Sequence, residues 1–265
     1  MFELFDEPIV LAVFLFIIGA VFGSFANVVI YRLPKGQSLV RPGSHCQSCQ
    51  VPIPWYLNIP IFAWFLLRGK CHKCGARFSI RYPLVELIMA SLFALAGYRL
   101  GLSWWLLESL IFIFGLVTVS FIDIDHMILP DKFTLSGIVI GLLGGALNPD
   151  RSFMDSFLGV FVGGGILWAV AYVYFVLRKR DGMGGGDIKL LAWIGALLGW
   201  QSIPLIILVS SLIGAIFGIV SALRSKKGMN HAIPFGPYLA GAALLYLLLN
   251  GPQWSQWYFE LHGFR

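Results

Sequence analysis

The amino-acid sequence predicts an all-α polytopic membrane protein with about eight transmembrane helices and one small cytoplasmic loop domain. Its 265 residues are 58% hydrophobic and have a mean hydropathy of +0.82. Only 12% of them are charged, whereas soluble domains average about 25% charged residues. The apolar residues also gather in runs that approach the roughly 20 residues a helix needs to cross a bilayer. Four cysteines in one polar segment predict the loop domain.

Eight segments are candidate membrane spans: residues 8–31, 84–100, 102–122, 133–148, 156–177, 188–201, 203–223 and 232–250. The fourth, sixth and eighth are short or rich in Gly and Pro, so the sequence leaves the count open by one or two. Acidic residues precede the first span and basic residues follow it. This is the reverse of a cleavable signal peptide, and it predicts an anchor whose N-terminus lies outside.

The distribution of basic residues predicts the same orientation. With the N-terminus outside, 16 of the 19 Lys and Arg residues fall in cytoplasmic segments, as the positive-inside rule requires. Residues 1–31 then form the first transmembrane helix, 32–83 a cytoplasmic domain, 84–250 a transmembrane core and 251–265 an extracytoplasmic tail. The net charge of +6 follows from this topology, so membrane lipid is an expected partner and nucleic acid is not.

All four cysteines lie in the predicted cytoplasmic loop, as two Cys-x-x-Cys pairs formed by Cys46, Cys49, Cys71 and Cys74. This spacing is typical of a zinc ribbon, in which four thiolates close a structural site. The alternative is one or two redox disulfides, which a reducing cytoplasmic location disfavours. A loop of about 50 residues holds little core of its own, so a structural metal is expected to stabilise it.

Two aspartates stand where carboxylates are costly, at the ends of apolar runs. Asp123 ends the third span, and Asp187 follows the glycine run Gly184, Gly185 and Gly186. A carboxylate at a membrane boundary usually marks a pathway or an active site. Two such groups near one water form an aspartyl protease, since close carboxylates share a proton. The glycines are predicted to let a substrate backbone approach. The alternative for Asp187 is an ordinary helix N-cap.

Five motifs, in this order along the chain, resemble the type IV prepilin peptidases of the bifunctional kind. They are residues 22–34 (FGSFANVVIYRLP), the double Cys-x-x-Cys loop with its IPWY and NIP segments, residues 81–86 (RYPLVE), residues 123–131 (DIDHMILPD) and residues 182–190 (GMGGGDIKL). The last contains the Gly-x-Gly-Asp pattern shared with presenilin-like aspartyl proteases. Each motif alone is weak, and their order makes the resemblance specific.

The resemblance implies an enzyme of the bacterial inner membrane that acts on prepilin and pseudopilin precursors. It would remove a short basic leader after a Gly at the cytoplasmic face and then methylate the new N-terminal residue with S-adenosylmethionine. In the family, the aspartates at the positions of Asp123 and Asp187 are catalytic. Family members without the cysteine loop are peptidase-only, so the loop in this sequence favours both activities.

The residues alone do not show methyl transfer, because the chain contains no strand-glycine-helix nucleotide fingerprint. By elimination, the methyl-donor site is expected between the cysteine loop and the first two spans, at Asn27, Arg32 and Glu86. Alternatives outside this family remain. A proton-coupled transporter also uses broken helices and intramembrane carboxylates, but it predicts inverted repeats that the sequence does not show. An assembly protein that docks partners through the loop predicts that both aspartates tolerate replacement by Asn.

Overall fold

A computed structural model describes residues 5, 7–149, 151–180, 182–224 and 233–261. Throughout these residues the regular structure is helical, with only two isolated β-bridges in the cysteine loop. The chain divides into two compact units, Met1–Thr118 and Val119–Arg265. The prediction of an all-α protein is confirmed.

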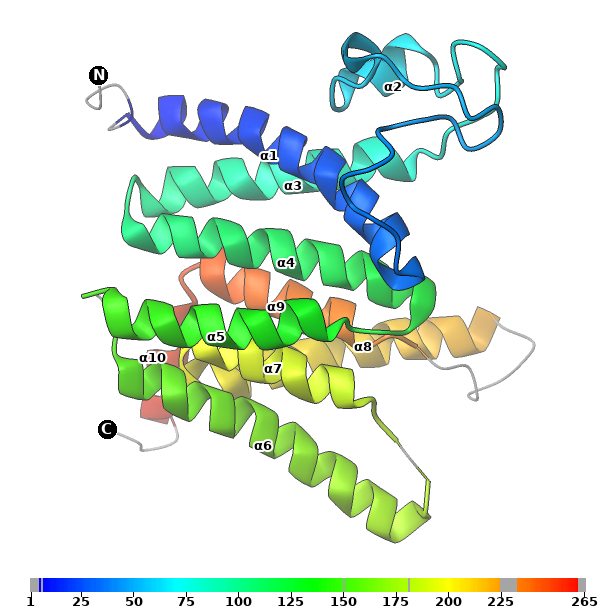
Figure 1. Ribbon diagram of the computed structural model, residues 1–265. Helices are drawn as coiled ribbons and strands as arrows, with labels where there is room; N and C mark the ends of the chain where they lie inside the picture. The colour runs from blue at the N-terminus through cyan, green and yellow to red at the C-terminus, as the bar shows by residue number, and fades with distance from the viewer. Residues whose placement is uncertain (1–4, 6, 150, 181, 225–232, 262–265) are drawn as a thin grey trace. The chain divides into compact units, whose positions relative to one another are not determined.

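The helices follow one another along the chain in Figure 1. They are α1 (Pro8–Arg32), α2 (Phe62–Leu66), α3 (Arg81–Leu100), α4 (Trp104–His126), α5 (Asp131–Leu147), α6 (Phe153–Arg178), α7 (Gly185–Leu198), α8 (Ile203–Arg224), α9 (Gly236–Leu248) and α10 (Gly251–Leu261), with 3₁₀ turns at Leu33–Lys35, Trp55–Leu57 and Trp200–Ser202. Each of the eight predicted spans contains a helix. The segment predicted as a C-terminal tail also contains one, α10.

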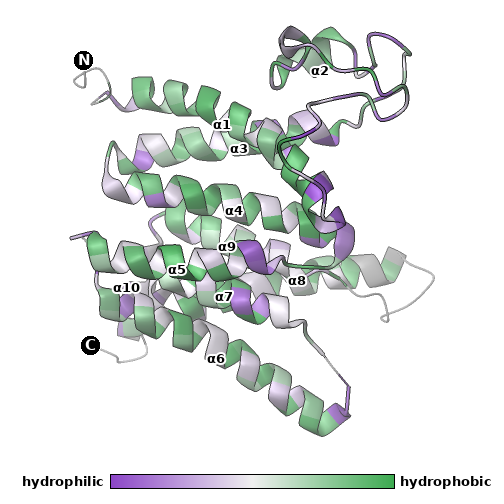
Figure 2. Ribbon diagram, viewed as in Figure 1, coloured by the Kyte–Doolittle hydropathy of each residue, from purple (hydrophilic) through white to green (hydrophobic). Residues whose placement is uncertain are grey.

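Five described helices are long and apolar enough to cross a membrane: Pro8–Lys35, Arg81–Leu100, Trp104–His126, Phe153–Arg178 and Trp200–Val220. In Figure 2 the ribbons of these helices are coloured largely green, which marks hydrophobic residues. The helices α5, α7 and α9 have only 17, 14 and 13 residues. The predicted count of eight spans is therefore not confirmed, although the protein is an integral membrane protein.

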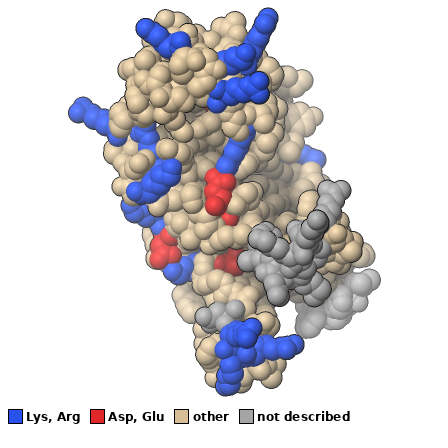
Figure 3. All heavy atoms as spheres, turned by 90° about the vertical axis from the view of Figure 1, so that its right-hand side faces the viewer, with Lys and Arg blue, Asp and Glu red and all other residues tan. Residues whose placement is uncertain are grey.

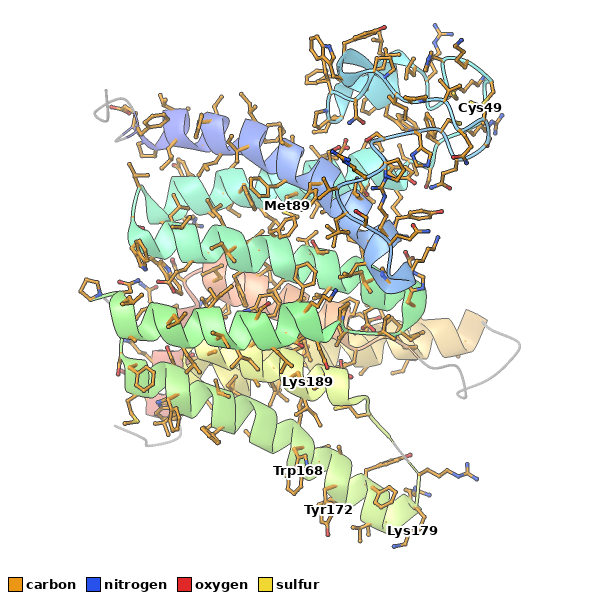
Figure 4. The ribbon with its side chains drawn as sticks, viewed as in Figure 1. Cys49, Met89, Trp168, Tyr172, Lys179 and Lys189 are labelled. Carbon is orange, nitrogen blue, oxygen red and sulfur yellow. The ribbon has the colours of Figure 1, made fainter. Side chains whose placement is uncertain are left out.

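In the first unit, α1 and α3 lie side by side (Figure 1). A Cβ on Gly19 would lie 2.8 Å from the Cα of Ala90, and one on Gly23 would lie 2.6 Å from the Cα of Glu86. Met89 is fully buried and points between the two helices (Figure 4). Small residues spaced by four allow this close approach, which membrane helices use because lipid is as apolar as their side chains.

The loop between α1 and α3 contains two turns with the same hydrogen bonds. The Cys46 amide donates to the Val51 carbonyl at 3.0 Å, and the Gln50 amide donates to the Cys46 carbonyl at 2.8 Å. In the second turn, Cys71, Ala76 and Gly75 make the equivalent bonds at 2.8 and 3.0 Å. Gln50 and Gly75 both adopt left-handed backbone, with φ of 59° and 70°. Each Cys-x-x-Cys pair therefore sits in its own tight turn.

The centre of the second unit is α7, in which every residue from 190 to 197 is buried. A helix that is buried on all sides is a core helix, and α5 and α6 both pack against it (Figure 1). Gly159 of α6 and Gly195 of α7 face each other so closely that a Cβ on either would overlap the other's backbone. This packing holds the first turn of α7, which carries Asp187, at the end of the core.

The opposite end of α7 is tied to its neighbours by one guanidinium group. Arg151 donates to the carbonyl of Ala196 at 2.7 Å, the hydroxyl of Ser156 at 2.8 Å and the carbonyl of Gly141 at 3.3 Å. These three groups belong to α7, α6 and α5. Since hydrogen bonds to charged groups are stronger than neutral ones, the arginine fixes the three helices in register.

Candidate functional site

Asp123 lies in the last turn of α4. The helix ends where Met127 adopts left-handed backbone, with φ of 55°, and the Met127 amide donates to the Asp123 carbonyl at 2.9 Å. The Asp123 side chain is buried, and its Oδ2 accepts a hydrogen bond from the backbone amide of Gly236 at 3.1 Å. One carboxylate oxygen is therefore held by the first residue of α9.

Asp187 lies in the first turn of α7, where its amide donates to the Gly184 carbonyl at 3.2 Å. Its side chain is buried, and its Oδ1 has no hydrogen-bond partner among the described residues. Buried polar atoms are nearly always paired in folded proteins. An orphaned carboxylate oxygen is therefore typical of a site whose partner is a water molecule or a substrate.

The two aspartates belong to the same unit, and their carboxyl groups interact electrostatically. Leu129 packs against the segments around the two aspartates. A Cβ on Gly186 would lie 2.9 Å from the Leu129 Cβ, and a Cβ on Gly236 would lie 3.1 Å from the Leu129 Cδ2. The end of α4, the start of α7 and the start of α9 therefore converge around this leucine, and the two glycines leave room for its side chain.

The three predicted substrate-approach glycines differ from one another. Gly186 is half-buried, and its missing side chain makes room for Leu129. Gly184 and Gly185 are exposed, and a Cβ on Gly185 would meet no atom within 4 Å. Steric need therefore explains Gly186, whereas the proposed role in substrate approach stays a prediction for Gly184 and Gly185.

An ion pair connects the starts of α5 and α7 beside the aspartates. The Lys189 Nζ lies 2.6 Å from the Asp131 Oδ1, and Figure 4 shows Lys189 on α7. The two side chains are 40% and 57% exposed, and exposed pairs contribute only about 0–1 kcal/mol. The pair therefore orients the two helix ends more than it stabilises the unit.

Sequence reasoning missed Gly236, whose contact with Asp123 spans 113 positions of the chain. A Cβ at this position would lie 2.7 Å from the Asp123 Oδ2. The residue sits between Pro234 and Pro237, and Pro237 occupies the first turn of α9. Proline in the first helical turn is a common start signal, so the sequence does indicate the helix start but not its carboxylate partner.

The four cysteines of the first unit form one cluster, in which all four sulfur atoms lie within 4.8 Å of one another. Cys46 and Cys74 are 3.8 Å apart, and Cys49 and Cys71 are 3.9 Å apart. Four ligands at the usual Zn–S distance of about 2.3 Å would be separated by roughly 3.8 Å in a tetrahedron. The cysteines are free thiols and their spacing fits a tetrahedral metal ion.

Backbone amides prepare two of these thiols for metal binding. The amides of Cys49 and Ser48 lower the pKa of Cys46 to about 6, and the amides of Cys74 and Lys73 lower the pKa of Cys71. The thiolate is the form that binds metals. The Ala76 amide lowers the pKa of Cys74, but the Cys49 thiol and burial outweigh it and raise that pKa to about 11. Full ionisation of the cluster therefore needs a bound cation.

A cavity of about 1000 Å³ lies within the first unit, between α1, the cysteine loop and α3, and the predicted donor residues all line it. The Asn27 Nδ2 donates to the Tyr82 carbonyl at 3.0 Å. Arg32 donates to the carbonyls of Ser38 at 3.1 Å and Gly43 at 3.4 Å. Each side chain is therefore tied to backbone that forms the cavity wall.

Glu86, the third of these residues, holds a strained turn. Its Oε2 accepts a hydrogen bond from the Ile61 amide at 2.6 Å. Ile61 has φ of 66° and ψ of −59°, and the next amide donates to the Pro60 carbonyl at 2.7 Å. This is a γ-turn of the rare, strained kind, and positive φ is costly for a β-branched residue. The carboxylate contact stabilises this part of the wall.

The remaining lining combines basic and aromatic side chains, with Arg41, Arg77, Tyr31, Trp64 and Tyr82 among them. Figure 3 shows Lys and Arg side chains in blue around the loop at the top of the view. Guanidinium groups bind carboxylates, and aromatic faces attract cations such as a sulfonium. The cavity therefore suits a ligand that carries both a carboxylate and a cationic centre.

Comparison with known proteins bears on both units. Residues 17–100 match the family model "Bacterial Peptidase A24 N-terminal domain", and residues 110–219 match "Type IV leader peptidase family". The chain belongs to the type IV leader peptidase family. This membership confirms the resemblance expected from the five motifs. It also argues against the transporter and the assembly protein, which the sequence had left open.

Several relatives share this family over nearly their whole length. The chain is 39% identical over 272 residues to the prepilin leader peptidase/N-methyltransferase of Aeromonas salmonicida (strain A449), with 92% of each chain covered. It is 36% identical over 283 residues to the protein of that name from Pseudomonas aeruginosa, with 98% of this chain and 97% of the relative covered. The Neisseria gonorrhoeae protein is 39% identical, with 90% of each covered. No solved structure matches the chain.

Proposed function

We propose that this protein cleaves the leader peptide from membrane-anchored prepilin and pseudopilin precursors and then methylates the new N-terminal residue. Peptide cleavage is assigned to Asp123 and Asp187. The observation that carries this assignment is the pair of buried, interacting carboxyl groups, of which Asp187 keeps one oxygen without a partner. An orphaned oxygen beside a second carboxyl group is where an attacking water binds in aspartyl-protease chemistry.

The reaction follows from the sharing of one proton by the two carboxyl groups. The ionised carboxylate removes a proton from water as its oxygen bonds to the scissile carbonyl carbon. The protonated carboxyl group donates to the carbonyl oxygen, which takes up the electron pair of the C=O bond. The C–N bond then breaks, and the leaving amine receives the proton that the carboxylate took from water. As the C=O bond re-forms, the hydroxyl made from the carbonyl oxygen returns its proton to the acidic carboxyl group, so both groups recover their starting states.

Methyl transfer is assigned to the cavity of the first unit, with S-adenosylmethionine as donor. When bound, this donor supplies a methyl group on a cationic sulfur. The cavity of about 1000 Å³ is at the upper end of ordinary small-molecule sites. The hydrogen bonds of Asn27, Arg32 and Glu86 to backbone groups support a role in shaping the wall, and Arg41 and Arg77 are suited to a donor carboxylate.

The cysteine cluster is assigned to a structural Zn²⁺ ion held by Cys46, Cys49, Cys71 and Cys74. Four thiolates leave no open coordination position, so the metal would have no catalytic role. His45, Gln47 and His72, which are next to the cysteines in the sequence, also line the cavity. The metal would therefore act by keeping this wall folded.

The charge distribution supports an orientation in the bacterial inner membrane with the N-terminus outside and residues 32–83 cytoplasmic. Eight of the Lys and Arg residues lie in the segment from Arg32 to Arg81, which carries most weight in this charge distribution. The structure describes all of this segment. Lys226, Lys227 and Arg265 of the charge pattern lie outside the described residues. On this orientation, Asp123 and Asp187 lie at the cytoplasmic ends of their helices, where a leader would be cut.

Mass spectrometry of a purified prepilin incubated with the protein and S-adenosylmethionine in detergent tests the proposed function. Wild-type protein is expected to remove the leader and to add one methyl group to the mature product. The variant Asp123→Asn, which keeps the side-chain volume but cannot ionise, is expected to leave the leader intact. Leader loss without a methyl group would contradict the methyl-donor assignment, and an intact leader with folded wild-type protein would contradict the peptidase.

Replacing Glu86 tests the cavity. Glu86→Ala removes the acceptor of the Ile61 amide, and a buried amide without a partner costs about 1–3 kcal/mol. Methyl transfer to a pre-cleaved peptide is therefore expected to fall about 5- to 150-fold. Glu86→Gln keeps an acceptor oxygen and is expected to retain most of the activity. Leader cleavage by the same preparations controls for folding. An equal loss in Gln and Ala variants would show instead that the carboxylate contacts the donor directly.

A further inference from the structure

The two aspartates have different surroundings. Asp123 Oδ2 accepts a direct hydrogen bond from the Gly236 amide at 3.1 Å. That amide opens α9, a helix of 13 residues, so the positive end of the helix dipole adds to the bond. Hydrogen bonds to the charged form of a carboxyl group favour that form. The Gly236 amide therefore favours the ionised form of Asp123 and opposes the effect of burying this side chain.

Asp187 has no equivalent bond to any residue that the structure describes. It lies in the first turn of α7, but the start of this helix has no side-chain cap and the Asp187 amide is used by the Gly184 carbonyl. Its Oδ1 is buried without a partner among the described residues. A direct charge-assisted hydrogen bond outweighs the field of a helix end alone. Burial without a donor favours the neutral, protonated form of a carboxyl group.

We propose that the Gly236 amide is a positioning group that keeps Asp123 ionised as the general base, while Asp187 carries the shared proton. This inference rests on the proposed peptidase function, since it states which member of the pair does which task. Asp123 takes the proton from the attacking water, and Asp187 donates its O–H to the carbonyl oxygen of the scissile bond. As the C–N bond breaks, Asp123 passes its proton to the leaving amine, and the hydroxyl made from the carbonyl oxygen returns its proton to Asp187 as the C=O bond re-forms.

Glycine is required at position 236 for this arrangement. A Cβ there would lie 2.7 Å from the Asp123 Oδ2 and 3.1 Å from the Leu129 Cδ2. Contacts under 3.0 Å do not occur for real Cβ atoms, so any side chain would push the Asp123 carboxylate away from the amide. The same α9 contains Gly241, where a Cβ would meet no atom within 4 Å, and this residue provides a matched control.

Other charged groups on the neighbouring helices do not reverse the assignment. The helix α9 has no charged residue. Among the described residues, the other charged or titratable side chains at these helix ends are exposed or half-exposed: Asp125 and His126 of α4, Asp131 and Lys132 of α5, Lys189 of α7 and Tyr238 of α9. Solvent screens exposed charges, and Lys189 is already paired with Asp131.

Infrared spectroscopy of the purified protein without substrate tests which aspartate holds the proton. The stretching band of a protonated carboxylic acid, identified by its shift in deuterated water, is compared between wild type, Asp123→Asn and Asp187→Asn. One such band is expected in wild type and in Asp123→Asn and is expected to be missing from Asp187→Asn. Its loss in Asp123→Asn, in both variants or in neither would overturn the assignment. Because no cleavage is measured, the result stands apart from the test of the peptidase.

The pH profile of leader cleavage tests the positioning role. Gly236→Ala weakens the bond that favours ionised Asp123, so the acid limb of kcat/KM is expected to move to higher pH while KM changes little. Gly241→Ala on the same helix is expected to keep the wild-type profile. A Gly236→Ala variant with an unshifted acid limb, or one whose loss appears only in KM, would refute the role of the amide. Circular dichroism of both variants confirms that the helices are intact.

Discussion

Replacing Asp187 with Asn is expected to lower kcat for leader cleavage by at least about a thousandfold, while methyl transfer to a pre-cleaved peptide continues. Asn has nearly the same size and preserves the first turn of α7, but it cannot hold or transfer the acid proton. Removal of a residue that acts as part of a catalytic unit commonly costs about 10⁴- to 10⁶-fold in kcat. Separate assays of a full prepilin and of a peptide that begins at the mature N-terminus measure the two activities.

Asp125 supplies a matched control for this experiment. It lies two residues after Asp123 on α4, but its side chain is exposed, and residues two apart do not share a helix face. Asp125→Asn is expected to keep both activities. If it lost cleavage as fully as Asp187→Asn, general charge at this surface, not a specific pair, would explain the effect. If Asp187→Asn lost both activities together, the assignment of methyl transfer to the first unit would be wrong.

Local pattern was sufficient to predict the parts of the fold that depend on neighbours in sequence. The long apolar runs that became α1, α4 and α6 and the paired Cys-x-x-Cys turns are features of this kind. The short helices α7 and α9 were harder, because their burial depends on glycines in other helices. Gly159 allows α6 to approach α7 closely. The sequence around α7 does not indicate this contact.

The candidate sites likewise contain residues that the sequence predicts and contacts that it does not. Asp123 and Asp187 stand out because a carboxylate in an apolar sequence is costly. The Gly236 amide does not stand out, because a backbone donor has no sequence signal and its partner is 113 positions away. Glu86 was selected by elimination and lines the cavity. Its bond to the strained Ile61 turn was not predictable, since sequence rules disfavour positive φ at isoleucine.

The double variant Cys46→Ser, Cys71→Ser is expected to lose its bound metal and to lose methyl transfer. These are the two cysteines whose thiolates the backbone amides favour and whose side chains are buried. Structural zinc binding contributes about 10–16 kcal/mol in small domains, which matches or exceeds the whole stability of a typical domain, about 5–15 kcal/mol. Without the metal, the loop should unfold and the cavity wall should be lost with it.

Three measurements check this expectation: metal content per chain, the rate of proteolytic nicking in residues 44–78, and methyl transfer to a pre-cleaved peptide. Lys73→Ser is the control, because Lys73 lies between Cys71 and Cys74 and its exposed side chain does not line the cavity. This variant should keep the metal and the activity. Metal retained by the double variant would place the ion elsewhere. A metal-free wild-type chain whose mass shows the hydrogen loss of disulfide formation would support the disulfide alternative instead, because oxidised sulfurs cannot provide four thiolate ligands.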